Sequence, residues 1–124
     1  MERQLLEDIF VTALEGGSNY WYHITAETNQ KIRKAVPRSE DPYLATAMLT
    51  AILDHGVSVE IHDAENPDEV LGVLSYERIK EQLEDIDRHL DYRWALEAHQ
   101  DEVGDAESAD IVFQYLVMGD VWFS

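Results

Sequence analysis

The segment 16–22 (GGSNYWY) places two glycines before three aromatic residues, and this pattern could bind a planar ligand. Glycine lets the backbone approach a ligand closely, and aromatic rings offer faces on which a nucleobase can stack. On a strand, Tyr20 and Tyr22 would share one face while Trp21 takes the other. An alternative interpretation is that the glycines only end a helix and that the aromatic rings belong to the core.

Basic residues gather in the next segment. Residues 28–38 contain no Asp or Glu, although the whole chain has a formal net charge of −17. On so negative a surface, a local positive segment is where an anionic ligand would be tolerated. Arginine suits phosphate groups through its bidentate fork. Alternatively, neighbouring carboxylates neutralise these bases, which are Lys31, Arg33, Lys34 and Arg38.

Together the two segments predict a non-enzymatic pocket for a nucleotide-like anion. A base would stack on an aromatic ring, and the basic side chains would hold the phosphates. If this anion is a nucleotide-like immune signal, tight binding without turnover would sequester it. The residues predicted to form this ligand site are Tyr20, Trp21, Tyr22, Arg33, Lys34 and Arg38.

Known catalytic and metal-binding patterns are missing from the sequence. There is no phosphate-binding loop, no dinucleotide fingerprint and no nucleophile elbow. The chain has no cysteine, which excludes disulfides, thiolate zinc sites and cysteine nucleophiles. The acidic stretch 63–74 fails as a calcium loop, because Pro67 and Asp68 occupy its fifth and sixth positions. The sequence therefore predicts no catalytic residue, no metal site and no cofactor.

Composition restricts the class of protein. The chain has 124 residues, with 26 acidic against 9 basic side chains. This balance argues against direct binding of nucleic acid, which needs a basic surface, and against an anionic membrane surface. A hydrophobic content of 45% is too high for a disordered acidic tail. The acidity could instead mimic nucleic-acid phosphates toward a basic protein, or serve only solubility or adaptation to salt.

The first half of the chain predicts two helices and a strand. Apolar residues at helical spacing predict a helix over 2–15, which the following glycines end. Aromatic and β-branched residues predict a strand over 19–25, whereas 26–38 is polar and ambiguous. A second clear helix opens with Asp41 as its N-cap and ends at Gly56.

The second half predicts a hairpin followed by helices. Period-two alternation and a central turn predict a β-hairpin over 57–74. Ser75 can cap the next helix, and 91–103 continues helically with a break. The helix over 109–118 is apolar nearly all round, which predicts burial on most sides. The apolar end 120–123 resembles a strand.

These elements predict one α+β domain spanning residues 1–124. Its small sheet, formed by the hairpin and by strands near 19–25 and 120–123, would be backed by helices and by the buried C-terminal helix. The apolar residues Val121, Trp122 and Phe123 favour pairing with a second copy, which predicts a homo-oligomer.

Three short motifs resemble those of a family of small bacteriophage proteins without assigned biochemistry. They are Gly-Gly-Ser-Asn-Tyr-Trp at 16–21, Ala-Asp-Ile-Val-x-Gln at 109–114 and Met-Gly-Asp-Val at 118–121. The resemblance implies a phage origin and the host cytoplasm as the setting. It suggests counter-defence, either by sequestering a nucleotide signal or by acting as an acidic decoy for a basic host protein. An accessory phage protein is the third alternative.

Overall fold

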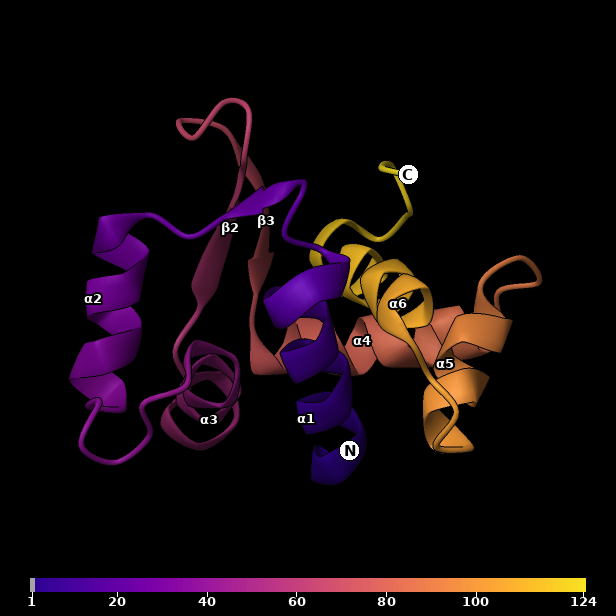
Figure 1. Ribbon diagram of the computed structural model, residues 1–124, viewed down its shortest axis with the longest axis horizontal. Helices are drawn as coiled ribbons and strands as arrows, with labels where there is room; N and C mark the ends of the chain where they lie inside the picture. Colours follow the sequence, from indigo (N-terminus) through magenta and orange to yellow (C-terminus); the bar gives the residue numbers. More distant parts are fainter. Residues whose placement is uncertain (1) are drawn as a thin grey trace.

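Residues 2–124, which the computed structural model describes, fold into helices and a small antiparallel sheet whose hairpin projects beyond them (Figure 1). This is the predicted α+β class. The helices are α1 (Arg3–Thr12), the π-helical turn η1 (Ala13–Gly17), α2 (Ala26–Ala35), α3 (Leu44–His55), α4 (Tyr76–Asp87), α5 (Arg93–Gln100) and α6 (Ala106–Met118). The strands are β1 (Tyr22–His23), β2 (Val59–Asp63) and β3 (Val70–Leu74).

The sheet has the order β1-β2-β3, with both neighbouring pairs antiparallel. Strands β2 and β3 form the predicted hairpin, and a bulge interrupts their register between Ile61 and His62. The strand predicted over 19–25 is limited to the two residues of β1. It is short because Trp21 N donates to Ser18 O in a turn before β1, and because Thr25 caps α2 after it by accepting from Thr28 N.

Two local predictions are corrected by the structure, and one ambiguous segment is resolved. The segment 120–123 forms no strand, because the amides of Trp122 and Phe123 donate to the side-chain oxygen of Gln114 instead of to a neighbouring strand. Residues 26–38, which were ambiguous in the sequence, contain α2. Asp41 is not the N-cap of α3. Its carboxylate accepts from Tyr43 N, and Tyr43 is itself the N-cap, so that α3 begins at Leu44.

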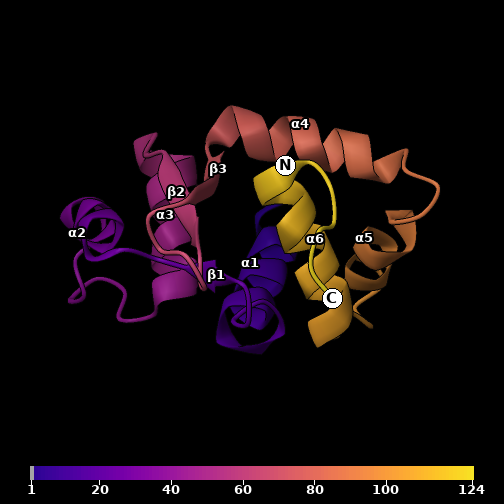
Figure 2. The ribbon, with the colours of Figure 1, turned by 90° about the horizontal axis from the view of Figure 1, so that it is seen from above.

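Helix α6 occupies the centre of the fold, as predicted from its apolar pattern. It packs between α1 and α5, and α4 crosses one end (Figure 2). Phe113 and Leu116 are fully buried. At the C-terminal end of α6, the Arg78 guanidinium donates to the carbonyls of Leu116 and Val117, at 3.4 and 3.0 Å. These bonds satisfy helix-end carbonyls that have no partner within the helix.

Two glycines let neighbouring backbone approach α6 at its ends. A Cβ atom on Gly17 would lie 2.4 Å from Ala106 O, and one on Gly72 would lie 2.0 Å from Val117 O. Both distances are far below van der Waals contact, so only glycine fits at either position. Among residues 2–124, no helix combines the length and apolar character that a membrane crossing requires.

Replacing Gly72 by alanine should destabilise the fold by about 1–3 kcal/mol, because backbone rather than a flexible side chain would have to move. Urea denaturation measures the loss. Gly16→Ala is the matched control, since a Cβ there meets no atom within 4 Å. Equal stability of the two variants would contradict the close packing of β3 on α6.

Candidate functional site

The carboxylate of Asp110, on α6, is the centre of a buried hydrogen-bond cluster. Only 8% of this residue is exposed. Its Oδ1 accepts from Ser18 Oγ (2.8 Å) and Trp21 Nε1 (2.7 Å). Its Oδ2 accepts from Tyr20 Oη (2.6 Å) and Gln114 Nε2 (3.1 Å). The cluster therefore joins the glycine–aromatic segment near the start of the chain to α6, and all four donors are uncharged.

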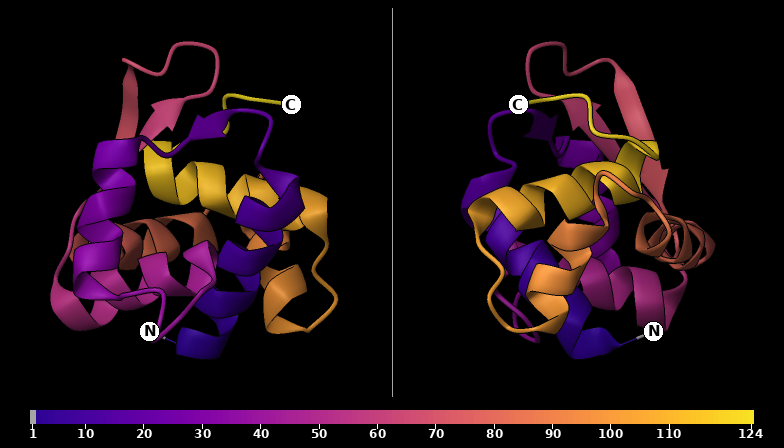
Figure 3. Two further views of the ribbon diagram at one scale, coloured as in Figure 1. Left: turned by 60° about the vertical axis from the view of Figure 1, so that its left-hand side comes forward. Right: turned by 90° about the vertical axis from the view of Figure 1, so that its right-hand side faces the viewer.

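Gln114 extends this cluster to the C-terminal tail. Its Oε1 accepts from the amides of Trp122 and Phe123, and its Nε2 donates to Phe123 O. The Phe123 ring stacks on Trp21 with ring centroids 5.4 Å apart and nearly parallel planes. The tail consequently lies beside β1 and the hairpin (Figure 3).

A cavity of about 580 Å³ opens beside the cluster, and we call it the Tyr20 pocket. Its volume lies in the range of small-molecule sites. Its only charged side chains are acidic, those of Glu107 and Asp110. Burial, followed by the hydrogen bond to Asp110, raises the pKa of Tyr20 to about 12, so the phenol stays neutral. The lining residues are Gly16, Gly17, Tyr20, Ala106, Glu107, Asp110, Ile111, Val121, Phe123 and Ser124.

The aromatic residues predicted to hold a nucleobase differ in their availability. Trp21 is only 2% exposed, and Phe123 and Phe113 cover its ring. Tyr22 is half-buried, and its hydroxyl donates to Leu14 O. Tyr20 is 45% exposed and lines the pocket. Of the three rings, Tyr20 is therefore the one that a ligand can reach.

The predicted basic residues lie away from this pocket. Arg33 donates to the carbonyls of Asp41 and Pro42 and so closes the loop after α2. Lys34 and Arg38 are exposed. Helix α2 starts beside β1 and runs away from it (Figure 1), so about 10 Å of helix separates its first residue from Arg33. The structure does not bring the aromatic and basic halves of the predicted site together.

A second surface feature is a series of three adjoining hollows along the start of α1, along α4 and along α5. Their volumes are about 250, 330 and 450 Å³, and the first and second share Glu2 while the second and third share Glu84. Lys80 and Arg88 are the basic residues at their walls. The acidic residues define what we call the acidic face: Glu2, Asp8, Glu81, Glu84, Asp85, Asp87 and Glu102.

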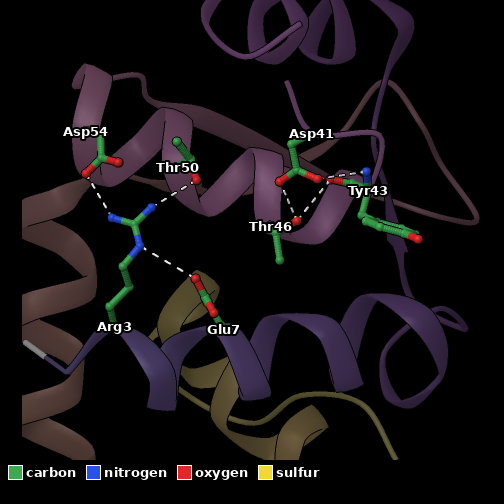
Figure 4. Close-up of polar contacts among 7 residues, drawn as sticks. All are labelled: Arg3, Glu7, Asp41, Tyr43, Thr46, Thr50 and Asp54. Carbon is green, nitrogen blue, oxygen red and sulfur yellow. Dashed lines mark hydrogen bonds and ion pairs between the residues drawn. The ribbon is translucent and has the colours of Figure 1, made fainter. Parts of the chain in front are cut away.

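Most of the basic side chains have partners within the protein. Arg3 donates to Asp54 at 2.9 Å, and this hydrogen bond lowers the pKa of Asp54. Arg3 also contacts Thr50 and Glu7 (Figure 4). The others bonded to carboxylates or to backbone carbonyls are Lys31, Arg33, Arg78, Arg88 and Arg93. Few bases therefore remain to neutralise the exposed acids.

Asp8, His99 and Ser108 form a chain of hydrogen bonds that resembles a catalytic triad. His99 Nδ1 lies 2.8 Å from Asp8 Oδ2, and its Nε2 lies 3.0 Å from Ser108 Oγ. Ser108 is almost completely buried, however, and its Oγ accepts from Asp105 N in the capping box of α6. A substrate cannot reach this oxygen. The chain is a structural link between α1, α5 and α6, and its residues are too far apart in sequence for spacing to indicate it.

Within residues 2–124, no group of three or more His, Asp or Glu side chains could hold a metal ion. Comparison of the chain with protein-family models, with curated proteins and with solved structures found no match. The resemblance to phage proteins stays a prediction. The homo-oligomer predicted from the apolar C-terminal residues also stays a prediction. Of these residues, Phe123 packs on Trp21 of its own chain, while Trp122 is 70% exposed.

Asp110→Asn should lower the free energy of unfolding by about 2–3 kcal/mol. An amide nitrogen in place of Oδ1 leaves Ser18 and Trp21 without an acceptor, and one in place of Oδ2 leaves Tyr20 and Gln114 without one. Urea denaturation of this variant beside the exposed control Glu107→Gln measures the effect. Equal stability of the two variants would contradict the central role of the Asp110 cluster.

Raising the pH from 10 to 12 should destabilise the protein. The pKa of Tyr20 is raised to about 12 in the folded state, whereas a tyrosine in an unfolded chain ionises near 10. The unfolded state therefore loses its proton first, and stability falls across this window. Unfolding at pH 9 and at pH 11 measures the drop, which should be smaller in Tyr20→Phe than in the parent.

Proposed function

We propose that this protein binds a basic partner protein through the acidic face and occupies a surface that nucleic-acid phosphates would otherwise contact. The observation that carries this proposal is the combination of charge and shape along α1, α4 and α5. The face has seven carboxylates beside three adjoining hollows, and two bases at their walls. Lysine and arginine side chains of a partner would enter the hollows and pair with the carboxylates.

Long-range attraction supports the same function. A net charge of −17 steers a basic protein toward the surface at rates that fall steeply with added salt. The Debye length of about 8 Å at physiological salt keeps the attraction local. Short-range pairing with the seven carboxylates of the acidic face would then determine where the partner docks. Because the sequence resembles phage proteins, we propose that the partner is a nucleic-acid-binding protein of the host.

Sequestration of an anionic nucleotide has less support from the geometry. The pocket that contains Tyr20 has carboxylates and no basic side chain in its wall. Phosphates placed there would meet Glu107 and Asp110. Of the two arginines in the predicted site, Arg33 is already bonded to backbone carbonyls, and Arg38 is exposed but does not line this pocket. We therefore favour the protein decoy over the nucleotide sponge.

Affinity capture from a host lysate tests the decoy. We expect the parent to capture a nucleic-acid-binding protein at about 50 mM salt, to lose it at about 500 mM, and to release it when duplex DNA is added. The variant Glu2→Gln/Glu81→Gln/Glu84→Gln/Asp87→Asn should capture about tenfold less.

The matched control removes the same charge elsewhere. Glu27→Gln/Glu40→Gln/Glu65→Gln/Glu69→Gln changes four exposed acids on α2, the loop after it and the hairpin turn. It should capture the partner as the parent does. Equal losses in the two variants would mean that general acidity, and not this face, is responsible. If no nucleic-acid-binding protein is captured at low salt, the decoy function is wrong.

A further inference from the structure

We propose that the Tyr20 pocket binds an organic cation: an ammonium group that is fully substituted by methyl groups, or by methyl groups and a hydrocarbon stem. This site is separate from the acidic face and does not depend on the decoy function. The pocket combines a buried carboxylate, two aromatic rings and apolar walls around one cavity of about 580 Å³. Each of these features selects a different property of the ligand.

The first feature is the uncompensated charge of Asp110. Its four hydrogen-bond donors are two hydroxyls, an indole and an amide, all of them neutral. Among the described residues, no basic side chain forms an ion pair with it. Buried carboxylates are ordinarily paired with a cation. The charge is satisfied by hydrogen bonds but not neutralised, and the adjoining cavity is where a cation can approach it.

The same hydrogen bonds argue against a metal ion. A carboxylate has about four lone-pair sites, and here four donors use them. Asp110 can therefore contribute its charge but no coordinating oxygen. A hard metal ion would lose its water ligands without gaining replacements. A fully methylated ammonium group needs no such ligand, because it has no N–H to satisfy and acts through a diffuse charge on the faces of aromatic rings.

The aromatic rings provide the contact that such a cation uses. Tyr20 and Phe123 both line the cavity, and the faces of aromatic rings attract ammonium groups through the ring quadrupole. With a pKa of about 12, Tyr20 keeps its phenol neutral. Gln114 and Trp21 hold Phe123 in place. Ile111 and Val121 supply apolar wall for a hydrocarbon stem.

The electrostatic balance at the pocket favours a cation. The start of α6 contributes about half a positive charge, which would by itself favour an anion. Glu107 and Asp110 in the pocket wall, together with the N-cap Asp105, outweigh it. The pocket therefore repels phosphates and carboxylates and attracts ammonium groups.

Calorimetric titration with tetramethylammonium chloride tests the proposal, with sodium chloride keeping ionic strength constant. We expect millimolar affinity. The neutral probe tert-butanol, which has a similar size, should bind at least tenfold more weakly. Equal binding of the two probes would show a purely apolar cavity and overturn the proposal, as would no detectable binding of tetramethylammonium.

Variants locate the site. Phe123→Leu keeps apolar bulk but removes an aromatic face, and it should weaken tetramethylammonium binding about tenfold. Glu107→Gln should weaken it about threefold. The control Glu84→Gln removes the same charge from the acidic face and should leave the affinity unchanged. If Glu84→Gln weakens binding as much as Glu107→Gln, or if Phe123→Leu has no effect, the assignment to this pocket is wrong.

Two further probes distinguish the natural sources of the ammonium group. Choline represents a free metabolite, and a short peptide with trimethyl-lysine represents a side chain of another protein. Tighter binding of either one supports the proposal and identifies its source. If both bind more weakly than tert-butanol, the proposal is overturned. Neither result depends on whether the acidic face captures a partner.

Discussion

The buried carboxylate of Asp110 is the interaction on which both ends of the chain depend. It holds Ser18, Tyr20 and Trp21 against α6, and Gln114, one turn later, holds the C-terminal tail. Burying a carboxylate is costly unless its oxygens are fully hydrogen-bonded, and here they are. The cluster therefore determines where the aromatic segment and the tail lie, and the pocket between them exists because the two are held on the same side of α6.

Close packing around α6 adds a second constraint. The helix is apolar on nearly every side because α1, α4, α5 and β3 all contact it. Gly17 and Gly72 allow backbone to approach its two ends more closely than any side chain would permit. Arg78 satisfies the carbonyls of its last turn. A central helix held in this way leaves little freedom to the elements that surround it, and α1, α4 and α5, which carry the acidic face, are among them.

The acidity of the protein has two distinct consequences. On the acidic face, exposed carboxylates act together over a distance set by salt screening, which suits a large basic partner. In the Tyr20 pocket, one buried carboxylate acts over a few ångströms beside aromatic rings, which suits a small organic cation. Most of the bases are bonded to carboxylates of their own neighbourhood or to backbone carbonyls, and Lys80 and Arg88 are the two that line the hollows of the acidic face. Both surfaces attract cations and repel phosphates.

Periodicity and composition by themselves determined the α+β class, the hairpin over 57–74, the burial of α6 and the strong negative charge, because each is encoded in neighbouring residues. The segment 16–22 was also recognisable as unusual. Only the tertiary structure decided what this segment contacts. The Tyr20 hydroxyl and the Trp21 indole donate to Asp110, some 90 positions away, and the segment does not join the basic residues of 31–38. The apolar end 120–123 looked like a strand, but the Gln114 side chain takes its amides. Local patterns specify which groups must be buried or bonded, whereas the choice among distant partners depends on how the packed helices bring them together.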